Sequence, residues 1–254
     1  MSVSGATLAR SSRRIPTVLL VSLLWILATT SAGALGWLLM VVVGYFTMGI
    51  GMFSVWLVVG GLVGLAQGAV LAWSLSASGR FALWRWKQSM CGWLSRGNTE
   101  HLATKDRSVV CIIIDWATVS AVGFLLCILV VFGLVALWPS EIALIPESWR
   151  LFLVYAWGGI AFGLMQCLLV QFGVWRGFWW VALSAVGWGL GGLIGTLLGD
   201  QFAVAMVPDS GYDGIILGPR NYAFSLAQGW IGATVYSVVT ALPVALLLRR
   251  PMVS

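Results

Sequence analysis

The sequence predicts an all-α fold: a polytopic membrane bundle of about six transmembrane helices in three hairpin repeats. Apolar residues make up 60% of the 254 residues and charged residues only 9%, whereas a soluble domain carries roughly a quarter charged residues. The phrase Gly-x-x-x-Gly-Leu-x-Gln occurs at 60–67 and again at 159–166, which indicates an internal repeat. The third observation is charge, because the connections between apolar segments alternate between basic and acidic.

Six apolar segments each reach the roughly 20 residues that a helix needs to cross a bilayer. They are predicted at about 16–41, 50–76, 108–138, 150–172, 178–199 and 222–248. The first follows three arginines, as a signal peptide would, but apolar sequence continues through Phe46 and predicts an uncleaved span. The third is long enough to imply tilt. Residues 1–254 are thus expected to form one membrane domain, with hairpins at about 16–76, 108–172 and 178–248.

The charges of the connections set the predicted orientation. The 77–107 loop carries six basic residues against two acidic ones, and the chain ends with Arg249 and Arg250 before its last four residues. The connections near Glu141 and Asp209 are acidic. Because basic loops stay in the cytoplasm, both termini are expected there, in a bacterial plasma (inner) membrane. Residues 84–96 predict either a short helix in the cytoplasmic headgroup layer or an irregular loop anchored by tryptophan.

The repeat extends beyond the glutamine phrase. Residues 116–123 and 180–187 share the pattern Trp-x-x-x-Ser-x-x-Gly, and residues 33–37 are a looser relative in the first segment. Residues 233–240 of the sixth segment align with the glutamine phrase and end on Thr240. Small residues four apart let two helices approach closely. Helix–helix contacts are therefore expected at Gly60, Gly64, Gly123, Gly159, Gly163 and Gly187.

Four polar side chains fall at a similar depth in the cytoplasmic half of the predicted bundle. Asp115 is the only acidic residue inside a span, and an ionisable group there costs at least about 2.5 kcal/mol on insertion scales. Gln67, Gln166 and Thr240 lie roughly 10–14 Å from the cytoplasmic ends of their helices. The four could line a site for a cation, a proton or a small polar solute. Alternatively, Asp115 pairs with an interfacial base and the glutamines bond across helices.

Residues 159–192 also carry a family resemblance. A Gly/Gln helix is followed by a basic turn at Arg176, a Trp179–Trp180 start and a helix containing Gly187–Trp188. In this order they resemble an uncharacterised group of multi-spanning bacterial membrane proteins that is frequent in cyanobacteria. The resemblance implies a membrane location, the thylakoid included if the source is a cyanobacterium, and it implies no particular activity.

The leading expectation for function is a non-catalytic scaffold or accessory subunit of a membrane assembly, since coupled transporters usually need several intramembrane charges. The alternative is a transporter for a small solute, a cation or a proton, with its polar site around Asp115. Neither Gly-x-Ser-x-Gly nor His-Glu-x-x-His occurs, which argues against an enzyme.

The sequence predicts no cofactor. A single histidine, His101, and the lack of a Cys-x-x-Cys pair argue against a metal site. The four cysteines are expected to be free thiols. The expected partners are the lipid bilayer and a membrane protein. Nucleic acid is not expected, because the basic residues lie between apolar segments.

Overall fold

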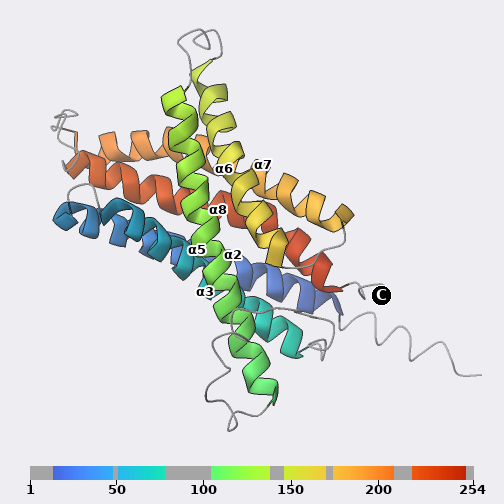
Figure 1. The fold of residues 1–254 in the computed structure, drawn as a ribbon. Coiled ribbons are helices and arrows are strands. Elements are labelled where there is room, and N and C mark those ends of the chain that lie inside the picture. The colour runs from blue at the N-terminus through green and yellow to red at the C-terminus, as the bar shows by residue number, and fades with distance from the viewer. Residues whose placement is uncertain are drawn as a thin grey trace, which may run out of the picture.

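The computed structural model describes residues 14–47, 51–77, 104–137, 146–169, 174–208 and 219–249. Every regular element in these ranges is an α-helix, which confirms the predicted fold class. Figure 1 shows the six helices in chain order: α2 (Arg14–Thr47), α3 (Gly51–Ala77), α5 (Thr104–Leu137), α6 (Glu147–Leu169), α7 (Val174–Met206) and α8 (Pro219–Arg249).

The composition of these segments explains why they are helical. In a bilayer the backbone has no water to bond with, and an α-helix satisfies its N–H and C=O groups within the segment. α2 and α7 are longer than predicted and end at Thr47 and Met206. Neither extension contains a proline, so no ring interrupts the backbone hydrogen bonds, and α7 ends shortly before Pro208.

The six helices form a closed ring in which each packs mainly against two neighbours. Successive helices are in contact throughout, from α2–α3 to α7–α8, and α8 closes the ring against α2. The hairpins are α2–α3, α5–α6 and α7–α8, which are coloured blue to teal, green to yellow and orange to red in Figure 1. Three interfaces join one hairpin to the next: α3–α5, α6–α7 and α8–α2.

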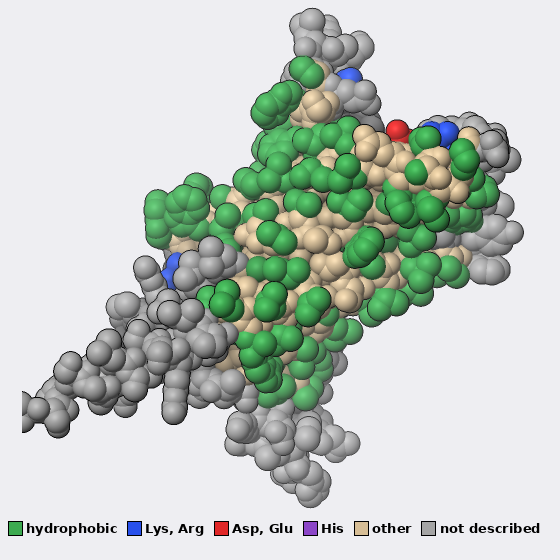
Figure 2. Space-filling model, turned by 180° about the vertical axis from the view of Figure 1, so that it is seen from behind, with side chains coloured by type: hydrophobic (Ala, Val, Ile, Leu, Met, Phe, Trp, Pro, Cys, Tyr) green, Lys and Arg blue, Asp and Glu red, His purple; other side chains and the backbone are tan. Residues whose placement is uncertain are grey.

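The outer surface of the ring is apolar. Leu27 is 62% exposed and Trp175 is 70% exposed, and on the face shown in Figure 2 the coloured charges lie near the edges of the molecule. Five helices, α2, α3, α5, α6 and α7, are long and apolar enough to cross a membrane. The chain is therefore a multi-spanning membrane protein. α8 is not among these five in the part searched, although it packs between α2 and α7.

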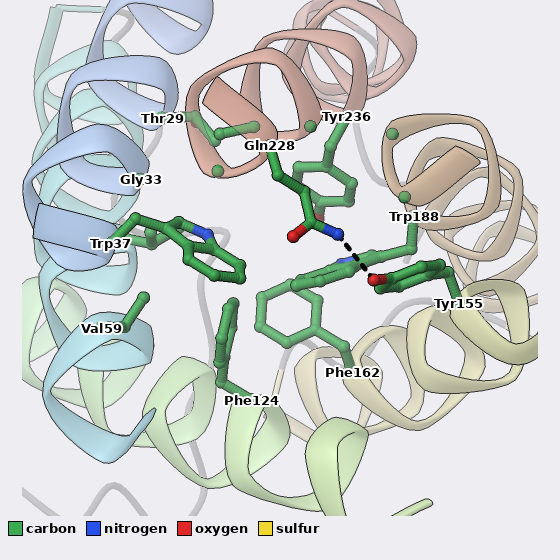
Figure 3. A pocket seen from close by; sticks show the side chains of 16 residues that line it. Thr29, Gly33, Trp37, Val59, Phe124, Tyr155, Phe162, Trp188, Gln228 and Tyr236 are labelled. Carbon is green, nitrogen blue, oxygen red and sulfur yellow. Dashed lines mark hydrogen bonds between the residues drawn. The ribbon is translucent and has the colours of Figure 1, made fainter. Parts of the chain in front are cut away.

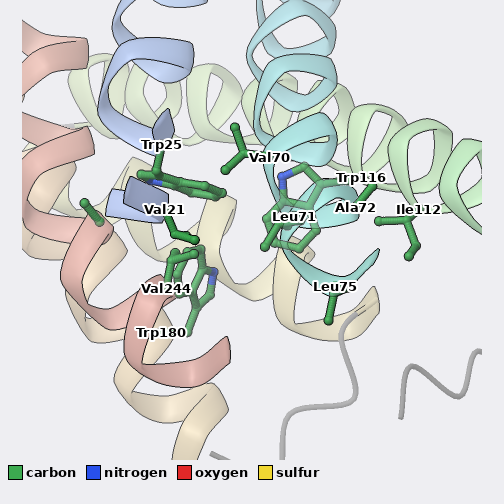
Figure 4. Close-up of a cluster of buried hydrophobic side chains, with 11 residues drawn as sticks. Val21, Trp25, Val70, Leu71, Ala72, Leu75, Ile112, Trp116, Trp180 and Val244 are labelled. Carbon is green, nitrogen blue, oxygen red and sulfur yellow. The ribbon is translucent and has the colours of Figure 1, made fainter. Parts of the chain in front are cut away.

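Two clusters of buried side chains fill the ring. One contains Phe124, Phe162 and Tyr236 and lies near the middle of the bundle (Figure 3). The other contains Trp25, Trp116 and Trp180 (Figure 4). The tryptophan cluster is the closer of the two to the N-terminal ends of α2, α5 and α7. The two clusters set the two levels on which the site is built.

One sequence expectation was wrong, and others fall outside the described residues. Cys127 and Cys167 are free, but Cys111 is disulfide-bonded. Cys127 is enclosed in the core, whereas Cys111 is only partly buried, in the first third of α5. The 84–96 segment, with its predicted interfacial helix, lies outside the residues that the structure describes.

Candidate functional site

Three tryptophans close the ring at one level. Trp25 on α2, Trp116 on α5 and Trp180 on α7 are each at most 2% exposed. Trp180 meets both of the others edge to face, with ring centroids 6.3 Å apart in each pair. Edge-to-face contact is a favoured geometry for aromatic rings. We call these three rings and the polar groups bonded to their indole N–H groups the tryptophan layer (Figure 4).

Gln67 joins three helices in this layer. The Trp116 indole Nε1 donates to Gln67 Oε1 at 3.2 Å, and Gln67 Nε2 donates to Thr29 Oγ1 at 3.1 Å. Thr29, on α2, lies one helical turn after Trp25. One side chain of α3 thus binds both a donor on α5 and an acceptor on α2.

Gln166 repeats this arrangement one hairpin later. Trp180 Nε1 donates to Gln166 Oε1 at 3.0 Å, and Gln166 Nε2 donates to Ser120 Oγ at 3.2 Å. Both glutamines are fully buried. A buried amide without partners would lose its hydration uncompensated, and here both ends of each amide are bonded. The repeat seen in the sequence is thus a repeat of hydrogen bonds.

The third interface has Thr240 at the equivalent position. Trp25 Nε1 donates to Thr240 Oγ1 at 3.0 Å, and this hydroxyl donates to the Tyr236 backbone carbonyl at 2.9 Å. Ser184 is the counterpart of Thr29 and Ser120, yet its hydroxyl has no hydrogen-bond partner in the described structure, although Ser184 is fully buried. Because threonine is shorter than glutamine, Thr240 still accepts from Trp25, but it does not donate to Ser184.

Glycines set the distance between helices at the first two of these interfaces. A Cβ added to Gly60 would lie 2.5 Å from Phe124 Cβ, and one added to Gly159 would lie 2.5 Å from the Ser184 carbonyl oxygen. Added Cβ atoms at the remaining predicted contact glycines would also approach neighbouring helices to 3.2 Å or less: Gly64, Gly123, Gly163 and Gly187. At the third interface the glycine lies on the other helix of the pair. A Cβ added to Gly33 on α2 would lie 2.5 Å from Ala233 Cβ on α8.

The four residues of the sequence-predicted polar site are placed at one level but are not joined around an open space. Gln67, Gln166 and Thr240 belong to three different interfaces, and the three tryptophan rings occupy the centre between them. Asp115, next to Trp116 on α5, is 3% exposed and has an interaction of its own. Its role in binding a cation or a proton stays a prediction, as does pairing with Arg85, Lys87 or Arg176.

A cavity lies beyond the tryptophan layer, inside the ring. Its lining comes from α2, α3, α5, α6, α7 and α8, and on α8 it extends from Gln228 to Tyr236, about 12 Å of helix. Thr240 lies one further turn along the same helix. The cavity has a volume of about 60 Å³, which is large enough to hold water. Figure 3 shows the lining side chains converging on this space.

The cavity is a consequence of small residues in the first hairpin. Where α6 and α8 carry Phe162 and Tyr236, α3 carries Val63; all three line the cavity. Where α5 and α7 carry Phe124 and Trp188, α2 carries Gly33. The first hairpin is therefore small at two positions where the other hairpins carry rings, although its Trp37 also lines the cavity (Figure 3).

One wall of the cavity is polar and ordered. Gln228 Nε2 donates to Tyr155 Oη at 2.8 Å and to Thr196 Oγ1 at 3.0 Å. These bonds orient the amide, and the dashed line of Figure 3 marks the bond to Tyr155. Two of the lining residues have a polar atom that is buried away from the cavity and has no partner with hydrogen-bond geometry: Trp188 Nε1 and Tyr236 Oη, the second of which lies close to the Ser184 hydroxyl.

The polar residues singled out from the sequence lie in or beside the tryptophan layer, whereas the cavity lies at another level of the bundle. The sequence patterns did not point to Tyr155 or Gln228, which lie outside the repeated phrases, nor to Tyr236, which lies within 233–240 but is not one of the repeated residue types. An alignment of the three hairpins could have indicated the cavity. At the positions of Val63 and Gly33 the other two hairpins carry aromatic residues. Within the described ranges no group of three or more His, Cys, Asp or Glu side chains could hold a metal ion.

No protein-family model, curated protein or solved structure matches this chain.

Proposed function

We propose that this chain is a non-catalytic membrane protein that binds a small neutral molecule in the central cavity. The observation that carries the proposal is the cavity itself: a mostly apolar space lined by all six helices, with a few polar groups. Ligand sites in proteins have this composition. The lining includes no charged side chain, so a charged ligand would lack a counter-charge inside the membrane.

The packing of the glycines favours this proposal over a scaffold or accessory subunit. The sequence expectation was that small-residue faces pack within the chain or against a partner. Gly60 and Gly159 are in contact with α5 and α7 of the same chain, so these faces are not available to another protein. The tryptophan layer supports one-sided access, because buried rings fill the centre of the bundle at that level.

The membrane, the orientation and the sixth crossing belong to the same proposal. The basic 77–107 loop and the basic C-terminal end favour cytoplasmic termini. An even number of crossings follows, and α8 supplies the sixth by packing between α2 and α7. On this basis the cavity lies in the half of the bundle away from the cytoplasm, in the bacterial plasma membrane.

Filling the cavity tests the proposal. Val63→Phe places a ring where the equivalent positions already hold Phe162 and Tyr236, and should exclude the ligand. Val58→Phe is the control, since Val58 is 49% exposed on the outer surface. Protein purified from its native membrane in mild detergent would be denatured and its small molecules identified by mass spectrometry. We expect at least tenfold less of one neutral compound from Val63→Phe than from the unaltered protein or Val58→Phe.

Two further results decide the proposal. Val63→Ala enlarges the cavity and should retain the compound, and thermal unfolding of all variants establishes that each is folded. Equal amounts of every compound in Val63→Phe and the unaltered protein would contradict binding in the cavity. A protein that co-purifies in fixed stoichiometry, with no such compound, would favour the accessory-subunit function.

A further inference from the structure

The side-chain amide of Gln228 turns an unpaired acceptor toward the cavity. Gln228 lines the cavity, and its amide nitrogen uses both protons, one on Tyr155 Oη and one on Thr196 Oγ1. The carbonyl oxygen, Oε1, accepts no hydrogen bond within the described residues, and it is not one of the polar atoms that the protein encloses completely. Figure 3 shows this oxygen on the side of the amide away from Tyr155, facing the space beside Trp37.

The hydrogen bonds around the amide fix which of its two ends faces the cavity. The Thr196 hydroxyl has one proton and donates it to the Gly192 backbone carbonyl at 2.7 Å. Thr196 can therefore only accept from Gln228, so the nitrogen of the amide must face it. The Tyr155 hydroxyl lies close to that of Thr196, whose second lone pair can take the Tyr155 proton. Gln228 thus has only its oxygen left to offer a ligand.

Glycines of α7 hold this part of α8 in place. A Cβ added to Gly195 would lie 2.8 Å from the Gln228 backbone carbonyl oxygen, and one added to Gly199 would lie 3.2 Å from the Gln228 backbone nitrogen. Groups on packed helices are held more precisely than groups on loops. Because polar atoms inside proteins almost always have partners, an acceptor fixed in this position indicates a ligand that donates a hydrogen bond.

The rest of the lining narrows the choice of donor. Phe124 and Phe162 stand edge to face, with centroids 6.1 Å apart, and offer an apolar surface. An aliphatic amine would be protonated near neutral pH, and in the described structure no charged side chain lines the cavity. An amide would bring a carbonyl oxygen that needs a donor of its own. A hydroxyl group supplies the proton without either cost.

Building on the proposed function, we infer that the ligand is a small neutral compound with a hydroxyl group on an apolar body. The hydroxyl donates to Gln228 Oε1, and the apolar body lies against Phe124 and Phe162. A ketone of the same shape would place its oxygen lone pairs against those of Oε1, and a site that bonds a hydroxyl group discriminates against such an analogue.

Two probes of matched shape separate this inference from the proposed function. Propan-2-ol and acetone share one carbon skeleton, but only propan-2-ol can donate a hydrogen bond. Gln228→Met removes the acceptor and keeps the length of the side chain. The control is Val238→Met, because Val238 is 54% exposed on the same helix. Apparent affinities come from the rise in unfolding temperature of the full chain in detergent with probe concentration. Val63→Phe, with the cavity filled, measures what each probe does elsewhere.

We expect propan-2-ol to bind the unaltered protein and Val238→Met about tenfold more tightly than acetone does, as one buried hydrogen bond implies. Gln228→Met should bind the two probes with affinities that agree within about twofold. Equal affinities for the unaltered protein, or a preference that persists in Gln228→Met, would overturn the hydroxyl inference and leave the cavity as a binding site. The first of these comparisons does not depend on the folding of any variant. If neither probe stabilises the unaltered protein more than Val63→Phe, the proposed function is overturned as well.

Discussion

The α3–α5 and α6–α7 interfaces differ from α8–α2 in one side chain of the tryptophan layer. In the first two, a glutamine accepts from a tryptophan across the interface and donates to a hydroxyl on the first helix of its own hairpin. In the third, Thr240 accepts from Trp25 and its proton goes to its own backbone. The tryptophan bond is therefore present three times, and the second bond only twice.

This difference separates a structural role from a functional one. Both ends of each glutamine amide are bonded, so we expect the two glutamines to hold helices together rather than to bind a ligand. Ser184 of α7, the counterpart of Thr29 and Ser120 in the third hairpin, has no partner with hydrogen-bond geometry in the described structure, although it lies close to the Tyr236 hydroxyl. The hairpin that carries the threonine therefore lacks one bond of the repeat, and its Tyr236 lines the cavity.

The largest expected effect comes from the backbone contacts that all three interfaces share. Gly60→Ala would put a Cβ 2.5 Å from Phe124 Cβ and 2.8 Å from the Ser120 carbonyl oxygen, which cannot move independently of α5. We expect a loss of about 2–3 kcal/mol in the free energy of unfolding. Gly61→Ala is the matched control, since its nearest neighbour would be 3.9 Å away. Reversible unfolding in mixed micelles measures both.

The exchange at the third interface gives a stricter version of this test. Gly33→Ala should be destabilising because Ala233 Cβ lies 2.5 Å from the new methyl group. Adding Ala233→Gly should recover most of the loss, since the methyl group is then carried by the other helix. If Gly60→Ala is no worse than Gly61→Ala, or the exchange recovers nothing, the close contacts do not determine the packing.

A smaller effect should distinguish the two kinds of interface. Gln166→Leu leaves the Trp180 indole and the Ser120 hydroxyl buried without their partner, and we expect a loss of about 2 kcal/mol. Thr240→Val has the same shape as threonine and removes only the acceptor for Trp25, for about 1 kcal/mol. The same unfolding measurement applies. Equal losses for the two variants would mean that the glutamine contributes no more than the threonine does.

The helices could be predicted from the sequence because their signal is local. An apolar run of some 20 residues has few alternatives to a helix in a bilayer, and the glutamine phrase gave two interfaces directly. The helix ends were less certain, since α2 continues to Thr47 through sequence that carries no stop signal. The partners of Gln67 could not be read from the sequence, because Thr29 and Trp116 are 87 residues apart and are joined only by this side chain, which lies on the helix between theirs.

The candidate site was less predictable, for a physical reason. Sequence reasoning looks for polar residues in apolar segments, and it found Gln67, Gln166 and Asp115. A cavity forms instead where side chains are small. Val63 and Gly33 are recognised as small only when the hairpins are aligned and the aromatic residues at the equivalent positions are seen. The alignment of the first segment used 33–37, whereas the structure pairs Trp25 and Thr29 with the tryptophan–serine pairs of the other hairpins.

The most direct test of the repeated interface is to complete its third copy. Thr240→Gln should accept from Trp25 and donate to Ser184, raising the free energy of unfolding by about 1 kcal/mol. The measurement is a double-mutant cycle with Ser184→Ala by unfolding in mixed micelles. We predict that the gain from Thr240→Gln disappears in the Ser184→Ala background. A gain of the same size in both backgrounds, or a loss in the presence of Ser184, would contradict a bundle built from three equivalent interfaces.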